Sequence, residues 1–483
     1  MSQKTIILVP YPTHSHVTPM LKLALAFLNL GFSPVMVIPE FIHRKLKSCT
    51  TSGLHTGEVT FLSVPDNGGR DHVPGDFFGI EEMVENSLPF HLESVVHELD
   101  EDGGVACVVV DLLVSSAVEV AHRCGVPVAG FWPAMLATFK LISAIPDMVG
   151  AGLISDTGSP LHREPTPILP NQPALSTEDL PWLIGTPTAR KGRFRFWKRV
   201  IGRSNSLCWL IVNSFPEEEF ETKKFSSNAL LDDPLGQPSI FQVGGLMDAP
   251  TNKINPSFSA KGTCPNGTSR KNELTKVDNS IPGTCNVINP SFLEEDTSCL
   301  QWLDTQKSSS VVYISFGSWV SPTGDGKVRN LALALEATGQ PFLWALGVAW
   351  RKELPSGFQG RSLGQGKVVS WVPQLEVLKH KAVGCYLTHC GWNSIMEAVQ
   401  CEKPLLCCPL AGDQFVNCAY VVDKWRVGVR IGGGFGREEF QESLRSLMED
   451  EEINHRLKKL HEKNVGPDAH LEAMSRLGSF VHD

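Results

Sequence analysis

The stretch of residues 371–414 reads WVPQLEVLKHKAVGCYLTHCGWNSIMEAVQCEKPLLCCPLAGDQ and carries the strongest fold signal of the chain. Its apolar runs at 384–388 and 405–408 predict two buried strands. Between them, residues 393–400 predict a helix that follows a Cys-Gly turn. Continuous apolar strands that alternate with helices favour an α/β fold with a parallel sheet covered on both faces.

The rest of the chain repeats this alternation. Its expected strands are 5–9, 34–38, 105–111 and 126–131 in the first half, and 311–316, 341–346 and 368–371 in the second. The expected helices are 19–30, 115–124 and 328–338. A chain of 483 residues exceeds the roughly 250–300 at which one core stops growing, so we expect two doubly wound domains.

The start of the predicted helix 393–400 is a candidate anion site, because its first backbone N–H groups lie at the positive end of the helix dipole. Asn393, Ser394 and the His389 imidazole add side-chain donors at the same corner. Glu397 lies one turn further, where a carboxylate accepts both hydroxyl protons of a ribose. This corner therefore predicts a bound nucleoside diphosphate.

Flanking residues fit the remaining parts of such a ligand. The Trp371 ring offers a stacking face for a flat base, and Gln374 offers hydrogen bonds to its edge. Asp413 and Gln414 offer an acceptor and a mixed amide to sugar hydroxyls. Each residue also has a structural alternative, as a core tryptophan, a tight turn or a helix N-cap, but the shared spacing favours the ligand-binding interpretation.

These motifs together resemble the nucleotide-sugar signature of plant family 1 glycosyltransferases. The resemblance rests on WVPQ at 371–374, THCGWNS at 388–394, and on Glu397, Pro404, Pro409, Asp413 and Gln414. It implies a UDP-sugar donor and a GT-B fold, in which two doubly wound Rossmann-like domains face a cleft. The donor-binding residues that it implies are Ser318, Trp371, Val372, Gln374, His389, Gly391, Trp392, Asn393, Ser394, Glu397, Asp413 and Gln414.

The expected domain ranges follow from these patterns and the resemblance. They are an acceptor-binding domain at 1–246, a linker at 247–298, a UDP-sugar-binding domain at 299–455, and a C-terminal helix at 456–483 that packs back toward the first domain. In the linker, the sequence INPSF at 254–258 recurs at 288–292 around a polar segment. This composition predicts a disordered insertion.

Composition excludes several other functions. A net charge of −9 argues against a nucleic-acid partner, and no apolar run reaches the ~20 residues that a membrane-spanning helix needs. The thirteen cysteines have neither CxxC nor metal-ligand spacing, so they predict reduced thiols and no metal site. With no cleavable apolar segment at its start, the chain is expected to be cytoplasmic. We also expect a monomer.

A candidate catalytic pair lies in the first half. His16 is expected in a loop between the first strand and a helix begun by Pro19, where the helix amino-terminus disfavours the imidazolium and leaves a general base. Asp111 ends a buried strand and needs a partner, and a parallel sheet places that strand end beside His16. The resemblance assigns the base and its orienting acid to these two residues. Each has a capping role as its structural alternative.

The sequence departs from the family pattern at four positions. Ser15 replaces a usual glycine, and His14 adds a second histidine two residues before His16. Glu402 also replaces a usual glycine, so its turn must adopt negative φ or be strained. Pro133 stands where many relatives have a threonine that contacts the sugar. A preference for glucose therefore rests on the resemblance alone.

We expect one in-line displacement at the anomeric carbon that gives an inverted, β-linked product. We expect the helix terminus and the histidine to take the place of a metal, and the UDP-sugar to be a co-substrate with no further cofactor. The sugar is expected to be transferred to a hydroxyl or carboxyl of a small lipophilic acceptor. The candidate residues to line an apolar pocket for this acceptor are Phe77, Phe78, Phe90, Trp132 and Phe139.

Two alternatives remain. The first is a catalytically impaired nucleotide-sugar-binding protein, disabled by the departures from the motif or by the linker. The second is an unrelated nucleotide enzyme such as a dehydrogenase. It is disfavoured because no Gly-x-Gly-x-x-Gly follows a first strand in either half.

Overall fold

The computed structural model describes residues 3–48, 59–66, 76–100, 104–162, 164–165, 167–216, 238–248, 295–317 and 326–482. Its contacts group the chain into two compact units. Unit 1 comprises Met1–Pro133, Arg199–Leu293 and Pro467–Asp483, and unit 2 comprises Ala134–Lys198 and Glu294–Gly466. The predicted linker insertion lies outside the described residues, and the predicted domain ranges stay predictions.

Unit 1 contains a seven-stranded sheet in which every neighbouring pair is parallel. In spatial order its strands are β3 (Thr60–Val64), β2 (Ser33–Pro39), β1 (Thr5–Val9), β4 (Val105–Asp111), β5 (Val128–Trp132), β6 (Trp209–Val212) and β7 (Ser239–Gln242). Its helices include α1 (His14–Asn29), α2 (Glu40–Ser48), α3 (Phe77–Glu82), α4 (Leu88–Asp100) and α5 (Ser116–Arg123).

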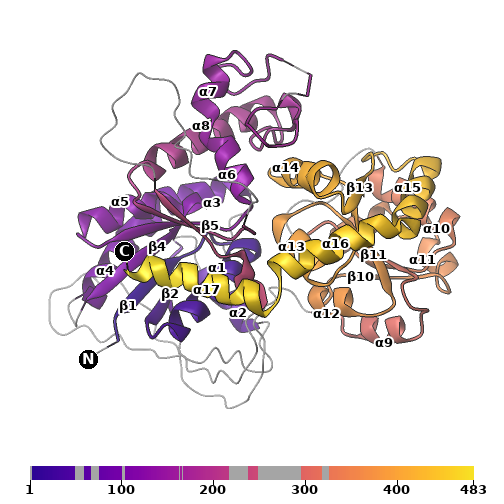
Figure 1. Cartoon of the computed structure of the whole chain (residues 1–483), viewed down its shortest axis with the longest axis horizontal. Helices are drawn as coiled ribbons and strands as arrows, with labels where there is room; N and C mark the ends of the chain where they lie inside the picture. Colours follow the sequence, from indigo (N-terminus) through magenta and orange to yellow (C-terminus); the bar gives the residue numbers. More distant parts are fainter. Residues whose placement is uncertain are drawn as a thin grey trace. The chain divides into compact units, whose positions relative to one another are not determined.

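The last helix of the chain, α17 (Pro467–His482), packs within unit 1 (Figure 1). The Phe480 ring lies 6.1 Å from that of Phe27 on α1, 6.2 Å from that of Trp209 on β6 and 5.6 Å from that of Phe241 on β7. These aromatic contacts attach the C-terminal helix to the first sheet. The preceding helix, α16 (Glu451–Asn464), belongs to unit 2.

Unit 2 contains a six-stranded parallel sheet. Its strands, in spatial order, are β10 (Gly366–Val369), β9 (Phe342–Ala345), β8 (Val311–Ser315), β11 (Val383–Thr388), β12 (Leu405–Cys407) and β13 (Gly428–Arg430). The connecting helices include α9 (Ser298–Asp304), α10 (Lys327–Thr338), α11 (Phe358–Arg361), α12 (Gln374–Lys379), α13 (Trp392–Gln400), α14 (Gln414–Ala419) and α15 (Arg437–Glu449). Helices α6 (Leu136–Ser143) and α7 (Ile145–Gly150) also belong to this unit, and α8 (Pro187–Ser204) contributes residues to both.

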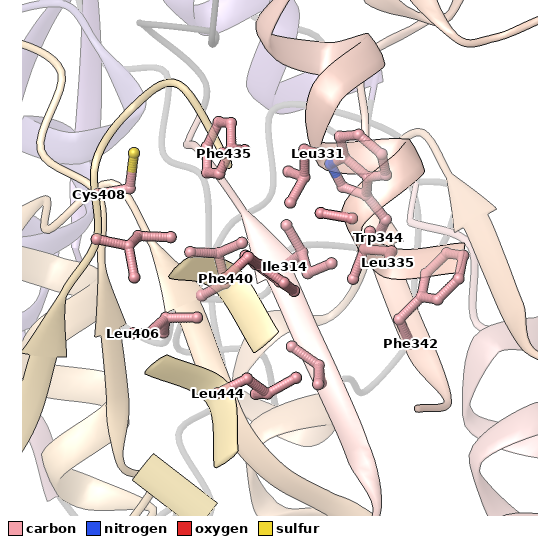
Figure 2. Packing of buried hydrophobic residues seen from close by; sticks show 14 of the residues in the cluster. Ile314, Leu331, Leu335, Phe342, Trp344, Leu406, Cys408, Phe435, Phe440 and Leu444 are labelled. Carbon is pink, nitrogen blue, oxygen red and sulfur yellow. The ribbon is translucent and has the colours of Figure 1, made fainter. Parts of the chain in front are cut away.

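A continuous apolar core fixes the strands of unit 2 (Figure 2). Leu331 and Leu335 from α10 and Phe440 from α15 pack with strand side chains such as Ile314 and Trp344, all of them buried. Burial of each such side chain stabilises the fold by about 1.5–3 kcal/mol. The strand ends that carry the polar residues therefore rest on a rigid base.

Both sheets start in the middle and are wound outward in two directions. In unit 1 the winding reverses between β1 and β4, and in unit 2 it reverses between β8 and β11. Ligands of such sheets bind beyond the carboxyl ends of the strands at this switch point. The predicted doubly wound α/β architecture is confirmed, and each sheet has one expected ligand-binding edge.

Several predicted boundaries were wrong, and two of these errors concern residues of the candidate site. Helix α1 begins at His14 rather than at Pro19, because the Thr13 carbonyl accepts the N–H groups of His16 and Val17 and starts the first turn. Pro19 lies inside the helix, where it removes only one backbone hydrogen bond. Strand β10 ends at Val369, so Trp371 lies beyond it rather than at its end.

Of the two conformations expected for Glu402, negative φ or a strained turn, the structure has the strained turn. After α13 the Glu402 N–H donates to the Val399 carbonyl (3.2 Å) and the Lys403 N–H to that of Ala398 (2.8 Å), the pattern of a Schellman C-cap. Glu402 takes the left-handed position with φ of +50°. The turn thus keeps the shape that a glycine would give it.

We therefore expect Glu402→Gly to raise the free energy of unfolding by about 1 kcal/mol, since an L-residue in this region costs about 1–2 kcal/mol. The measurement is a thermal or urea melt. Glu402→Ala is the control, because it loses the same His461 contact (3.7 Å) but keeps a Cβ at positive φ. Equal stability of the two variants would contradict the strain.

Candidate functional site

His16 and Asp111 meet at the switch point of the first sheet. His16 lies on the first turn of α1, just after β1, and Asp111 is the last residue of β4. The His16 Nδ1 atom lies 2.7 Å from Asp111 Oδ2, with Asp111 fully buried and the His16 side chain 18% exposed. The predicted contact is therefore present.

The geometry fixes the imidazole tautomer. A carboxylate only accepts hydrogen bonds, so Nδ1 carries the proton that is donated to Asp111, and Nε2 is left as an acceptor. The other carboxylate oxygen, Asp111 Oδ1, accepts the Leu113 N–H at 3.0 Å. Asp111 thus both caps the short 3-10 turn Leu112–Val114 and orients His16, which combines the two alternatives left open by the sequence.

His389 occupies the corresponding edge of the second sheet, and two glycines hold its ring. A Cβ on Gly317, just after β8, would lie 2.7 Å from His389 Nε2, and a Cβ on Gly391 would lie 2.5 Å from the same atom. Gly317 also has φ of +74°. Any side chain at either glycine would displace the imidazole, so both glycines are required by its position.

The His389 imidazole is neutral in this setting. Burial lowers its pKa from the ordinary 6.5 to about 4, and interaction with the Ser315 backbone opposes this shift only in part. A neutral imidazole donates one N–H without carrying a charge. His389 lies just before the N-terminus of α13, which begins at Trp392 after Gly391 as N-cap.

We expect the His389 ring signal to stay constant from pH 8 to pH 5 in an NMR titration of histidine-labelled protein, with His389→Gln identifying the signal. Because the folded pKa is depressed, the unfolded chain binds more protons between pH 6.5 and 4. The stabilisation by this group is therefore complete above pH 6.5 and is lost as the pH falls toward 4. A ring that titrates near pH 6.5 in the folded protein would contradict its burial.

A buried hydrogen-bond network lies behind the α13 terminus. Gln374 Nε2 donates to Glu397 Oε2 (2.7 Å) and to Ser394 Oγ (3.3 Å). Its Oε1 accepts from the hydroxyls of Tyr313 (2.9 Å) and Tyr386 (3.2 Å). Burial raises the pKa of Tyr386 to about 12 and that of Tyr313 well above its usual range, so both remain donors. The network holds the Glu397 carboxylate in one orientation.

This network gives Gln374 and Ser394 partners within the protein. Their expected contacts with a base edge and a diphosphate stay predictions, because in this structure both side chains serve the network. Sequence reasoning missed Tyr313 and Tyr386, which read as ordinary strand residues. Only the pairing of β8 with β11, which sets Tyr313 opposite Tyr386, places the two rings together.

The Asp413-Gln414 pair is held by its own loop. Asp413 Oδ2 accepts from Asn417 Nδ2 (2.8 Å), which also donates to the Cys390 carbonyl (3.0 Å). Asp413 holds the N-cap position of α14 but makes no side-chain cap bond there. Gln414 Oε1 accepts the N–H groups of Leu410 (2.8 Å) and Ala411 (3.0 Å), and these bonds fix its amide. The i,i+4 spacing of Asp413 and Asn417 is the signal that would have identified Asn417.

The remaining predicted residues differ in exposure. Val372 and Trp392 are 3% and 4% exposed and belong to the core, whereas Trp371 and Asn393 are half-buried. Ser318 lies outside the described residues. Of the aromatic residues expected around an acceptor, Trp132 is buried and Phe90 is 61% exposed.

Comparisons with known proteins agree with this geometry. Residues 290–467 match the family model described as UDP-glucoronosyl and UDP-glucosyl transferase. The chain is 50% identical to UDP-glycosyltransferase 82A1 of Arabidopsis thaliana, covering 97% of this chain and 96% of that protein. It is 29% identical to UDP-glycosyltransferase 83A1 of the same organism, with 100% and 97% covered.

Solved structures confirm the predicted GT-B fold. The UDP complex of a UDP-glucose: anthocyanidin 3-O-glucosyltransferase matches with a TM-score of 0.73 and 26% identity, over 100% of this chain and 99% of that one. UGT2 of Phytolacca americana, complexed with UDP-2fluoro-glucose and pterostilbene, matches with a TM-score of 0.74 and 21% identity, over 99% and 100%. None of the described helices is long and apolar enough to cross a bilayer.

Proposed function

Because this chain belongs to the UDP-glycosyltransferase family, we propose that it transfers glucose from a UDP-sugar to a small lipophilic acceptor. The transfer inverts the configuration of the anomeric carbon. Its activity as a glycosyltransferase that uses a UDP-sugar follows from the family. The choice of glucose, the stereochemistry, the base and the acceptor class are our proposal. The accepting group is a hydroxyl or a carboxyl.

The His16–Asp111 contact is the observation that carries the mechanism. With Nδ1 donating to Asp111, Nε2 of His16 accepts the proton of the acceptor hydroxyl. The acceptor oxygen then attacks the anomeric carbon as the bond from that carbon to the diphosphate oxygen breaks. One displacement of this kind turns an α-linked donor into a β-linked product. Asp111 stabilises the positive charge that develops on the imidazole.

The donor contacts of unit 2 support departure of UDP. The neutral His389, the first amides of α13 and the oriented Glu397 carboxylate are the groups that we assign to the diphosphate and the ribose. We also propose that the reaction needs no metal, since these donors offset the charge that develops on the diphosphate. The absence of any further cofactor is part of the same proposal.

The identity of sugar and acceptor rests on relatives. The names of two solved relatives include UDP-glucose with an anthocyanidin, and a fluoro-glucose donor with pterostilbene. By analogy we assign glucose as the transferred sugar and an apolar phenolic or terpenoid alcohol as the acceptor. We assign Asp413 and Gln414 to contacts with the hexose. We further propose a cytoplasmic monomer, and the ten described cysteines, all free thiols, fit a reducing compartment.

The test is incubation of purified protein with UDP-glucose, a chelator and a panel of phenols, terpenoid alcohols and carboxylic acids. We expect UDP release only with an acceptor, and a β-linked anomeric proton in the NMR spectrum of the product. An α-linked product would contradict inversion, and activity only after adding back a divalent ion would contradict metal independence. Tight UDP-glucose binding without turnover on any acceptor would favour the impaired binding protein.

A further inference from the structure

Three cysteines from separate elements of unit 2 meet in its interior. Cys390 lies in the turn after β11, Cys407 ends β12, and Cys418 is on α14. Each is fully buried, and their three Sγ atoms all lie within 4.8 Å of one another. Their wide spacing in the sequence kept this group from being recognised by metal-ligand spacing. We refer to it as the trithiol cluster.

The trithiol cluster has nearly the dimensions of a metal site. Three sulfurs bound to one Zn²⁺ at about 2.3 Å stand about 3.8–4.0 Å apart. The sulfurs therefore need to approach one another by less than about 1 Å to share such an ion. The thiols make only weak hydrogen bonds to the backbone. The Cys390 thiol lies 3.8 Å from the Thr388 carbonyl, and the Cys407 thiol lies 4.0 Å from the Leu405 carbonyl.

The residue before Cys418 carries a buried polar atom without a partner. Asn417 precedes Cys418, is fully buried, and donates to the Cys390 carbonyl through Nδ2. Its Oδ1 is buried and has no hydrogen-bond partner among the described residues. A buried carbonyl oxygen without a partner is costly, so the packing of α14 beside the cluster is not fully satisfied.

We propose that the trithiol cluster binds one thiophilic divalent cation of the Zn²⁺ and Cd²⁺ class, held by Cys390, Cys407 and Cys418. Three S–H bonds release their protons to solvent and three metal–sulfur bonds form, with no change in oxidation state. Soft thiolate ligands select such ions over Mg²⁺ or Ca²⁺. The site does not depend on the proposed transfer reaction, and the ion takes no part in that reaction.

The cluster is sealed, so the ion enters as the chain folds or during local opening. The full-length protein is therefore expressed with Cd²⁺ in the medium, desalted under reducing conditions, and assayed for cadmium by mass spectrometry. We expect one tightly held cadmium per chain and the ultraviolet thiolate-to-cadmium charge-transfer band of three Cd–S bonds. Wild-type protein without the retained ion or the band would overturn the proposal.

The control variants separate this cluster from other thiols. Cys407→Ser and Cys418→Ser each remove one ligand. Each is expected to lower the affinity for cadmium at least about tenfold, because even changes to residues that only contact a metal ligand cost about 10–100-fold in affinity. Cys408→Ser changes the neighbouring buried thiol and keeps the ion. Cys124→Ala removes a partly exposed cluster with Glu93 and His97, and also keeps the ion. Retention in Cys407→Ser and Cys418→Ser, with folding verified by thermal melting, would contradict the assignment.

Discussion

Replacing His16 by alanine is expected to lower kcat for glycosyl transfer about a thousandfold, because general-base catalysis contributes about 10²–10⁴-fold. The Kd for UDP should not change, since the groups that we assign to the nucleotide all belong to unit 2. Steady-state kinetics give the first value, and calorimetric titration with UDP gives the second. The His16→Ala variant thus separates chemistry from donor binding.

Two variants control this prediction. His14→Ala removes the other histidine of the first turn of α1 and should leave kcat within a few-fold of wild type. Asp111→Asn removes the carboxylate that fixes the imidazole tautomer and should lower kcat by about 10²–10⁴-fold. A large loss in His14→Ala with full activity in His16→Ala would move the base to His14. That result would match the departure of this loop from the family pattern.

The second large effect is expected from Gly317→Ala, which should weaken UDP binding at least tenfold, equivalent to about 1.4 kcal/mol. Its new Cβ would lie 2.7 Å from His389 Nε2, so the imidazole must move from the position in which we expect it to meet the diphosphate. Titration with UDP measures the loss.

Gly326→Ala is the matched control for this substitution. Gly326 has φ of +71°, close to the +74° of Gly317, but a Cβ there meets nothing within 4 Å. Both variants bear the same backbone strain, and only Gly317→Ala displaces His389. Equal UDP affinity in the two variants would show that His389 does not contact the nucleotide.

Much of the fold was predictable because its strands are long apolar runs. Strands β1 and β4 were predicted to the residue, and the pairing of His16 with Asp111 was predicted from the parallel winding together with the family resemblance. The start of α1 was missed, because Pro19 suggested an N-terminus whereas the Thr13 carbonyl starts the helix earlier. A local rule fails where a proline is tolerated inside a helix at the cost of one hydrogen bond.

What could not be predicted depends on contacts between distant strands. The tyrosines that hold Gln374 and the three thiols of the trithiol cluster come from elements that are neighbours only in the folded sheet. The dual use of Asp111, with one oxygen for a cap and one for His16, also needs coordinates. Motif spacing identifies the residues of the candidate site, whereas the packing of neighbouring elements decides which partner each side chain takes.

The most direct test of the central claim compares wild type and His16→Ala on phenols whose hydroxyl pKa ranges from about 7 to about 10. If His16 is the general base, the loss in kcat/KM should be about a thousandfold for the least acidic phenol. The loss in kcat/KM should become smaller as the phenol becomes more acidic, because an ionised phenol needs no base. An equal loss across the whole series would contradict the role of His16 as the base.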